Sequence, residues 1–350
     1  MTPARDPREA LRAFAVPHLA TECRPVRGGH INETWRAGPW LLQRLNPDVF
    51  PEAESIMENV RAVARRLAER PDSRADLGLV PTADGHWWHT ASDGAVWRLF
   101  RFIAGESLET APTPAHAEGA ARAFGEFTRI MSDPPLPLRV TLPGFHDTRL
   151  RLEALAAAAH RDTAGRAVPA ARVIDAILAE HELACVIPAL LGSGGLPLRV
   201  AHNDAKIANV IFAADSATPV AVIDLDTAMP GTPLHDFGDL VRSMVSDSTE
   251  DADARSVQVR HDFFTAIVRG FLAGTDGMLT EGERSLLVTA ARSIALEQAA
   301  RFLTDHLAGD RYFAVRAEGQ NLQRARTQLA LLEGLTRDAE QLESIVALAS

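Results

Sequence analysis

A group of polar residues near the middle of the sequence has the types and spacing needed for chemistry on a phosphate group. His202, Asp204, Lys206 and Asn209 form the pattern H-x-D-x-K-x-x-N, and Asp224 follows fifteen residues after Asn209, behind an apolar run. A carboxylate can orient a hydroxyl group and accept its proton, and a lysine can neutralise a transferred phosphoryl group. Amide and carboxylate oxygens suit Mg²⁺. We therefore predict that Asp204 and Lys206 are catalytic and that Asn209 and Asp224 bind the metal of a phosphoryl-transfer site.

Two members of this group carry further information. Lys206 is the only lysine among 36 lysine and arginine residues, so arginine fills every other cationic position. A retained lysine indicates a site that favours a compact point charge over a planar guanidinium. His202 is interpreted as a hydrogen-bonded loop histidine rather than a base.

The elements around the group are expected to bring its members together. The β-forming runs 210–212 and 220–223 predict a short hairpin with Asn209 and Asp224 at its open end. Strands are expected within 87–90 and 95–103. The segment 23–49 is expected to form two antiparallel strands joined by a Gly28-Gly29 turn. Helices are expected over 7–15, over 51–70, where Ile56, Val60, Val63 and Leu67 form one apolar stripe, and over 114–131, 150–160, 170–185, 234–245, 257–272, 281–307 and 318–348.

Length and composition exclude several classes of protein. The 350 residues correspond to about two domains at roughly 150 residues each. A net charge of −10 lacks the basic field that nucleic-acid binders need. No apolar run reaches the roughly 18 residues of a membrane span. Two cysteines, Cys23 and Cys185, are too few for a disulfide framework, and the charged start is not a secretory signal, so a cytoplasmic location is expected.

Two segments carry a resemblance to a known superfamily. HNDAKIANVIF and VIDLDTAMPGTPLHDFGDLVR resemble the catalytic and metal-binding loops of the aminoglycoside phosphotransferase and protein-kinase-like superfamily. The segments GGHINETW, LLQRLNPDVFP, MENV, FHDT and RFLTDHLAGDRYF look like the N-acetylhexosamine 1-kinase group. The resemblance implies an α+β, two-lobed kinase-like fold that uses ATP and Mg²⁺. Its small antiparallel-sheet N-lobe with one major helix would cover 1–103, its mainly helical C-lobe 104–350, and its hinge about 98–105.

The resemblance also assigns nucleotide-binding residues, with departures from the protein-kinase pattern. Gly28, Gly29, Ile31 and Asn32 would lie in the loop over the phosphates, although this segment is not G-x-G-x-x-G and also suits a plain hairpin turn. Phe102 would lie at the adenine-binding hinge. The strand expected to carry a phosphate-pairing lysine reads LLQRL at 41–45, so Arg44 is the candidate and Gln43 is the alternative on the opposite face.

Two more positions are assigned by the same resemblance, outside the group that binds phosphate and metal. Glu58 on the helix over 51–70 is either an ion-pair partner for that strand or a surface residue. Asp236 in HDFGDLVR is interpreted as a support for the loops rather than a catalytic residue.

The acceptor side is assigned from RFLTDHLAGDRYF. Arg301 and Tyr312, with His30, the FHDT segment and Asp204, would bind a sugar, because a guanidinium can satisfy hydroxyl and acetamido oxygens. The expected reaction is transfer of the ATP γ-phosphoryl group to the anomeric hydroxyl of an N-acetylhexosamine, by a monomer or weak homodimer. Two alternatives stay open: a kinase of the same fold for homoserine, choline or an aminoglycoside, and a non-catalytic pseudokinase.

Overall fold

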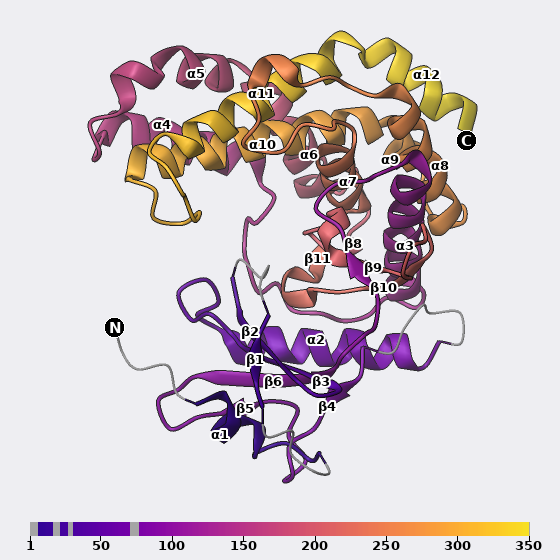
Figure 1. Ribbon diagram of the computed structural model, residues 1–350. Coiled ribbons are helices and arrows are strands. Elements are labelled where there is room, and N and C mark those ends of the chain that lie inside the picture. Colours follow the sequence, from indigo (N-terminus) through magenta and orange to yellow (C-terminus); the bar gives the residue numbers. More distant parts are fainter. Residues whose placement is uncertain (1–5, 17–21, 27–30, 71–76, 350) are drawn as a thin grey trace.

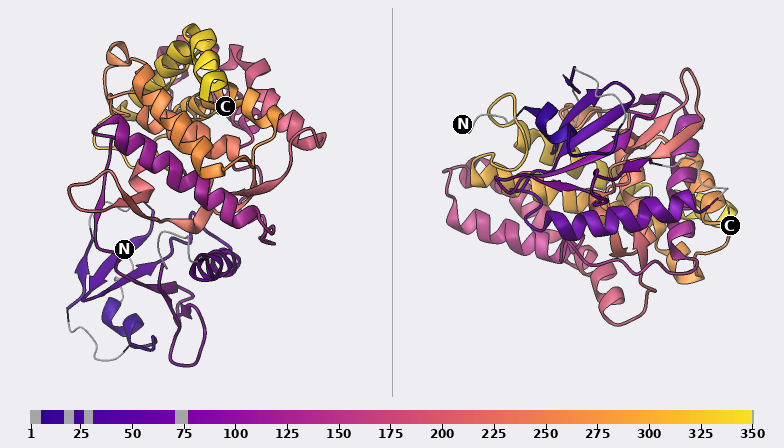
Figure 2. Two further views of the ribbon diagram at one scale, coloured as in Figure 1. Left: turned by 90° about the vertical axis from the view of Figure 1, so that its right-hand side faces the viewer. Right: turned by 90° about the horizontal axis from the view of Figure 1, so that it is seen from below.

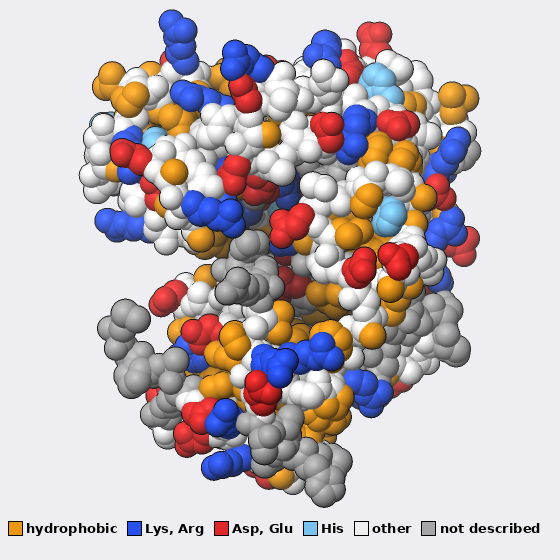
Figure 3. Space-filling model, in the orientation of Figure 1, with side chains coloured by type: hydrophobic (Ala, Val, Ile, Leu, Met, Phe, Trp, Pro, Cys, Tyr) orange, Lys and Arg blue, Asp and Glu red, His pale blue; other side chains and the backbone are white. Residues whose placement is uncertain are grey.

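The computed structural model of the protein describes residues 6–16, 22–26, 31–70 and 77–349. An antiparallel sheet with one long helix forms the small lower part, and helices form most of the larger upper part (Figure 1). We call residues 6–101 the small lobe and residues 106–349 the large lobe. A hollow separates the two on the face shown in Figure 3. Of the described helices, none is both long and apolar enough to cross a membrane.

The small lobe is built on a six-stranded sheet in the order β1-β2-β3-β6-β4, with β5 also paired to β6. The strands are β1 (Arg24–Pro25), β2 (Glu33–Ala37), β3 (Trp40–Arg44), β4 (Leu79–Val80), β5 (His89–Thr90) and β6 (Val96–Arg101). Every pairing is antiparallel, and the register places Gln43 opposite Arg98 and Arg44 opposite Trp97.

The prediction of two strands over 23–49 was wrong, because the described residues of this segment form three. The tight turn joins β2 to β3 at Gly38, where φ is 61°. Glycine adopts this left-handed conformation at little cost. The Gly28-Gly29 turn falls outside the described residues.

Alternation along β3 and β6 gives the sheet two different faces. Leu42 and Trp97 point to the outer face and pack with Leu11 of the short helix α1 (Pro7–Leu11). Gln43 and Arg98 point to the other face, toward helix α2 (Ala53–Ala68). Helix α2 buries the predicted apolar stripe and lies between the sheet and the large lobe (Figure 1).

The large lobe is a set of packed helices. They are α3 (Pro114–Ser132), α4 (Thr148–Arg161), α5 (Ala167–Ala179), α6 (His181–Gly192), α7 (Pro233–Met244), α8 (His261–Thr275), α9 (Glu281–Ser285), α10 (Leu287–Ala308), α11 (Gln320–Arg337) and α12 (Ala339–Ala349). Helices α3 and α8 pack side by side (Figure 2). Their approach depends on Gly270, because a Cβ atom there would overlap the backbone of Glu118.

Three predicted helices are each divided in two. The segments 170–185, 281–307 and 318–348 break near Glu180, Leu286 and Asp338, where ψ rises to 24°, 2° and 7°. No glycine or proline stands at 180, 286 or 338, so the sequence pattern shows no boundary there. At Asp338 the carboxylate forms hydrogen bonds with the side chains of His261 and Arg337.

Short strands between the lobes hold the predicted chemical group. Strands β7 (Glu106–Ser107), β9 (Val210–Phe212) and β10 (Pro219–Val222) form one antiparallel sheet, and β8 (Arg199–Ala201) pairs with β11 (Met229–Gly231). The predicted hairpin is therefore present. It continues into two single-turn helices, η1 (Ile207–Asn209) and η2 (Leu225–Thr227).

Asn59 attaches helix α2 to the large lobe. Its Nδ2 donates to the carbonyl groups of Arg139 and Ala228 at 2.8 and 3.1 Å, and its Oδ1 accepts from the Arg139 amide at 3.0 Å. The neighbouring Glu58 forms an exposed ion pair with the Arg139 side chain at 3.1 Å. Glu58 therefore contacts the large lobe and not strand β3.

Replacing Asn59 with leucine removes these three hydrogen bonds at a buried position. We expect Asn59→Leu to lower the free energy of unfolding by about 1–3 kcal/mol, because buried backbone groups lose their partners. The matched control Glu58→Gln changes only an exposed ion pair and should change the free energy of unfolding by less than about 0.5 kcal/mol. Urea denaturation measures both, and equal effects would show that Asn59 is not a special anchor.

Candidate active site between the lobes

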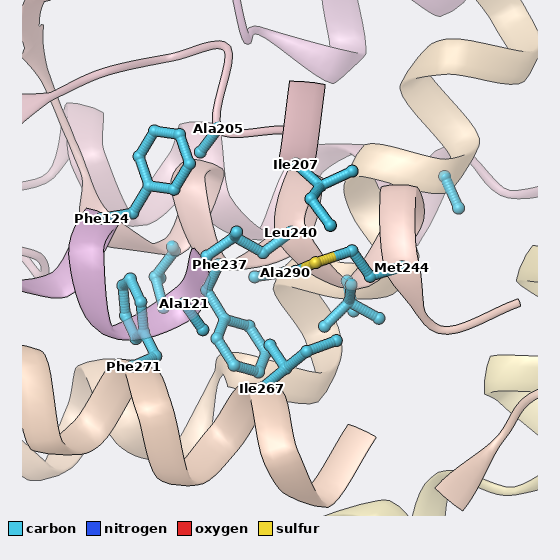
Figure 4. Close-up of a cluster of buried hydrophobic side chains, with 14 of the residues drawn as sticks. Ala121, Phe124, Ala205, Ile207, Phe237, Leu240, Met244, Ile267, Phe271 and Ala290 are labelled. Atoms are coloured by element: carbon cyan, nitrogen blue, oxygen red, sulfur yellow. The ribbon is translucent and has the colours of Figure 1, made fainter. Parts of the chain in front are cut away.

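The loop between β8 and β9 brings three of the predicted residues into direct contact. Lys206 Nζ donates to the two carboxylate oxygens of Asp204 at 3.1 and 2.8 Å. Asn209 Nδ2 donates to Asp204 Oδ2 at 2.7 Å and to the Asp204 carbonyl at 2.8 Å. Ala205 and Ile207 alternate with these residues and point into the buried cluster of the large lobe (Figure 4). The apolar residues therefore anchor the loop while its polar residues stay together.

The contacts around Asp204 set its charge. Burial alone would raise the pKa of its carboxyl group, but the Lys206 ammonium and the hydrogen bonds from Lys206 and Asn209 hold that pKa at about 2. For Lys206, burial opposes the charged form, and the negative charges of Asp204 and Asp224 nevertheless raise the pKa above its usual value. Both groups are ionised at neutral pH, so Asp204 can accept a hydrogen bond from a hydroxyl group.

Asp224 lies directly after β10, beside Asn209. Val222 pairs with Val210, and the Ile223 amide donates to the Asn209 carbonyl at 2.9 Å. The Asp224 backbone is left-handed, with φ of 64°. Desolvation, with the charges of Asp226 and Asp204, raises the pKa of Asp224 to about 7.

The surroundings of Asp224 fit a magnesium ion. Within the described residues Asp224 is exposed, and no hydrogen bond or ion pair reaches its carboxylate. An accessible carboxylate beside an amide oxygen offers the hard donors that Mg²⁺ binds, with phosphates and water completing the shell. In the same ranges no three His, Cys, Asp or Glu side chains form a metal-binding cluster, so Asp224 and Asn209 supply a partial shell only.

Backbone hydrogen bonds tie the two loops to each other. Asp236 of α7 accepts from the amides of His202 and Asn203 at 2.9 and 2.7 Å. Thr227 Oγ1 donates to the His202 carbonyl at 2.7 Å, and His202 Nε2 contacts the Ile223 carbonyl at 3.0 Å. These contacts place His202 and Asp236 in supporting positions.

A buried ion pair joins the loop that carries Asp224 to the small lobe. The two terminal nitrogens of Arg98, Nη1 and Nη2, donate to the Asp226 carboxylate, Nη2 at 3.0 Å. Each of the two side chains is only 2% exposed. Asn32 Nδ2 donates to Asp226 Oδ2 at 2.7 Å, and Arg98 Nε donates to Gln43 Oε1 at 2.9 Å. Asn32 Oδ1 also accepts from the Asn46 amide at 3.0 Å. Asn32 therefore lies beside the loop that carries Asp224.

Sequence reasoning did not select Arg98 or Asp226. The alternation of β6 could have placed Arg98 on the face of Gln43, and the D-x-D spacing of 224 and 226 could have drawn attention to Asp226. Neither signal shows that the two side chains meet, because 128 residues separate them.

The remaining nucleotide-site predictions fall in other places. Arg44 lies on the outer face of the sheet and pairs with Glu33 at 3.2 Å. Phe102 is covered by the guanidinium of Arg36, 3.9 Å from its ring centroid. Ile31 is 40% exposed. Gly28, Gly29 and His30 lie outside the described residues.

Arg301 and Tyr312 come together at the end of α10. The Arg301 guanidinium lies 5.5–6.0 Å from the ring centroids of Phe145, Tyr312 and Phe313. Asp305 fixes the following loop by accepting from the amides of 311, 312 and 313 at 2.8–2.9 Å. Tyr312 is left 54% exposed on this loop, which projects from the large lobe on the side of the small lobe (Figure 1).

Removing one partner of the buried pair should destabilise the protein strongly. We expect Arg98→Met to lower the free energy of unfolding by about 3–5 kcal/mol, because Asp226 keeps a buried charge without a cation. Arg98→Met combined with Asp226→Asn should recover most of that loss. The control Arg44→Met removes the partly exposed pair with Glu33 and should cost less than about 1 kcal/mol. Denaturant unfolding of the four proteins decides this, and no recovery in the double variant would refute the charge argument.

Comparison with known proteins places the chain in a family. The model of the phosphotransferase enzyme family matches residues 22–271, more than two thirds of the chain. The chain is similar to a solved aminoglycoside phosphotransferase from Alicyclobacillus acidocaldarius, at 16% identity and a TM-score of 0.61 over 98% of both chains. It is similar to a choline/ethanolamine kinase family protein from Mesorhizobium loti, at 18% identity and 0.59, over 97% of this chain and 98% of the other.

A third solved structure, an AMP-bound spectinomycin phosphotransferase, is 12% identical with a TM-score of 0.56, over 93% of this chain and 96% of the other. The three structures share their fold with this chain. With the family match, the conclusion is that the chain belongs to the phosphotransferase enzyme family.

Proposed function

We propose that the protein is an ATP-dependent kinase that transfers the γ-phosphoryl group to the anomeric hydroxyl of an N-acetylhexosamine. The observation that carries the transfer chemistry is the contact set of Asp204, Lys206 and Asn209 beside Asp224. The proposed base, cation and metal ligands then lie on two adjacent loops that hydrogen bonds connect to each other. The fold shared with an AMP-bound phosphotransferase supports the use of an adenine nucleotide.

The side chains have separate tasks in this mechanism. Asp204, ionised at neutral pH, accepts a hydrogen bond from the acceptor hydroxyl and orients its oxygen toward the phosphorus. Lys206 neutralises charge that develops on the transferred group. Asn209 and Asp224 would hold Mg²⁺, which supplies charge neutralisation to the phosphates when bound. Because the transition state is loose, a base of low pKa suffices: full proton removal is not needed before transfer.

On the nucleotide side, Arg44 is not retained as the phosphate-pairing residue, because it lies on the outer face of the sheet and pairs with Glu33. Arg98 is buried and pairs with Asp226, two residues from Asp224. We therefore assign Arg98 and Asn32 to support of the Asp224 loop rather than to contact with a phosphate. The prediction that Gly28, Gly29 and Ile31 cover the phosphates and that Phe102 lies at the adenine edge is retained.

The acceptor side favours a neutral sugar over a cationic alcohol. A quaternary ammonium group binds on free aromatic faces, but the Arg301 guanidinium already lies near the rings of Phe145, Tyr312 and Phe313. A fixed positive charge also repels a polycationic aminoglycoside. An arginine beside an exposed tyrosine instead offers donors to the oxygens of hydroxyl and acetamido groups.

A panel of acceptors tests the reaction. Purified protein is incubated with ATP and Mg²⁺ and with N-acetylglucosamine, N-acetylgalactosamine, unacetylated hexoses, homoserine, choline or kanamycin. ADP release is measured, and the position of the phosphate is assigned by ³¹P NMR. The proposal expects a sugar 1-phosphate from the N-acetylated sugars. Turnover of another acceptor alone contradicts the sugar assignment, and nucleotide binding without turnover supports a pseudokinase.

Replacing the base separates chemistry from nucleotide binding. Asp204→Asn should lower kcat by about 10²- to 10⁴-fold, as for loss of a positioned base, while the Kd for ADP stays within about twofold because Asp204 does not contact the nucleotide. Asp215 lies in the turn of the same hairpin, so the matched control Asp215→Asn should retain full turnover. Isothermal titration and steady-state kinetics measure the two quantities. Unchanged kcat in folded Asp204→Asn would eliminate Asp204 as the base.

Replacing the acceptor arginine should affect one substrate only. We expect Arg301→Gln to raise KM for the N-acetylhexosamine by about tenfold or more, since a hydrogen bond to a charged group contributes roughly 1.5–3 kcal/mol. KM for ATP should not change. The control Arg292→Gln removes an arginine of the same helix that bonds Thr336 instead. Equal sugar KM values for both variants would place the sugar elsewhere.

A further inference from the structure

A buried histidine connects helix α10 to the catalytic loop. His146 Nδ1 contacts both carboxylate oxygens of Glu297 at 3.1 and 3.2 Å, and its Nε2 contacts the Asn203 carbonyl at 2.9 Å. The His146 side chain is 7% exposed and that of Glu297 is 2% exposed. The FHDT segment, which the sequence suggested as a part of the sugar site, therefore places its histidine inside the protein.

The partners of the ring indicate a charged pair. A carbonyl oxygen and an ionised carboxylate only accept hydrogen bonds, so both ring nitrogens must carry a proton for both contacts to form. Burial alone would lower the pKa of His146, but the charge and hydrogen bonds of Glu297 raise it. Burial alone would raise the pKa of Glu297, and His146 with Arg301 and Arg151 lowers it to about 2.

The other groups around the ring agree with this charge state. His235 of α7 lies with its ring centroid 4.7 Å from that of His146, and burial with the His146 charge lowers the pKa of His235 to about 3. His235 is therefore neutral and does not compete for Glu297. Asp239, also on α7, adds a more distant negative charge that favours the charged form of His146.

The pair connects the two ends of the proposed reaction. Glu297 is one helical turn before Arg301 on α10, so both side chains share a face of the helix. Asn203 directly precedes Asp204, and its backbone is left-handed, with φ of 62°. Asp236 holds the Asn203 amide, and the carbonyls of Ala201 and Thr227 hold its side chain.

The Asn203 carbonyl is oriented from a different side. Within the described part of the chain, the donor that reaches it is His146. This carbonyl and the Asp204 amide belong to one planar peptide unit. The hydrogen bond from His146 therefore fixes the orientation of that peptide unit and, through it, the position of the Asp204 side chain.

We infer that His146 and Glu297 are positioning residues that hold the catalytic carboxylate of Asp204 in register with the acceptor-binding arginine on α10. The pair does not touch the reacting atoms. It transmits the position of the acceptor helix to the catalytic loop through one ion pair and one hydrogen bond. The inference rests on the proposed function in the roles given to Asp204 and Arg301.

Kinetics of paired variants distinguish positioning from simple stabilisation. His146→Leu leaves Glu297 as a buried charge without its partner and should reduce both stability and kcat. His146→Leu combined with Glu297→Met removes that charge as well, so stability should return. We expect kcat of the double variant to stay about 10- to 100-fold below wild type, because the Asn203 carbonyl still lacks its donor and small misplacements are costly. The KM for ATP should not change.

Two more variants complete the series. His146→Gln keeps an N–H donor and should retain more of kcat than His146→Leu. The control His160→Leu removes an exposed histidine of α4 and should have wild-type kinetics. Return of kcat together with stability in the double variant would overturn the positioning role and leave a structural one.

A spectroscopic measurement tests the charged pair without relying on turnover. In protein labelled with ¹⁵N-histidine, the resonances assigned through His146→Gln should show two protonated ring nitrogens at pH 7.5, and in Glu297→Gln the ring should become neutral at that pH. A neutral His146 in the wild-type protein would overturn the inference whatever acceptor the enzyme uses.

Turnover is therefore scored both with the sugar and as slow ATP hydrolysis by water, which needs Asp204 but not Arg301. If the wild-type protein hydrolyses ATP but does not phosphorylate the sugar, the proposed acceptor is rejected. The positioning role of His146 and Glu297 is then still tested by comparing ATP hydrolysis among the variants. If His146→Leu in the double variant lowers sugar transfer but not hydrolysis, the pair positions α10 rather than Asp204, and the inference fails in its stated form.

Discussion

The ion pair between Arg98 and Asp226 is the constraint on which the arrangement of the two lobes depends. It connects the central strand of the small lobe to the loop that carries Asp224, and both of its side chains are almost fully buried. Two charges lose most of their hydration in such a place, so the pair contributes little net stability unless its remaining hydrogen-bonding groups are satisfied. Here Asn32 and Gln43 satisfy them. With these groups satisfied the pair is tolerated in the interior, and it fixes the position of the Asp224 loop against the small lobe.

That arrangement has a chemical consequence for the loop that carries Asp224. Arg98 pairs with Asp226, while the solvent-accessible Asp224 carboxylate is partly desolvated by the surrounding protein and lies near the negative charges of Asp226 and Asp204, which together raise its pKa to about 7. A divalent cation offsets this repulsion directly. On the other loop Lys206 keeps Asp204 ionised with a pKa of about 2. The carboxylates of Asp204 and Asp224, on two neighbouring loops, thus have opposite environments, one suited to a metal and the other to a hydroxyl group.

The sequence was sufficient to predict which residues come together where local spacing decides it. Asp204, Lys206 and Asn209 lie within six residues, and a four-residue strand leads to Asp224, so a hairpin alone brings them together. Arg98 and His146 meet partners 128 and 151 residues away, and no spacing rule predicts such contacts. The face of the sheet that carries Gln43 was also undecided, because alternation gives two faces without saying which one is covered by α2. The helix breaks at Glu180, Leu286 and Asp338 were missed because no glycine or proline marks them in the sequence.

Helix α10 shows why acceptor choice and catalytic geometry are not independent in this molecule. Arg301, Glu297 and Asp305 lie at four-residue intervals on it, so they share one face. Asp305 holds the loop of Tyr312, Arg301 lies among the aromatic rings, and Glu297 reaches the catalytic loop through His146. A substitution that repacks this face for a different acceptor also shifts the support of Asp204. Under the proposed mechanism, a change of substrate would therefore require compensating changes at His146 or Glu297, and exchange of the exposed Tyr312 loop alone would leave the catalytic geometry intact.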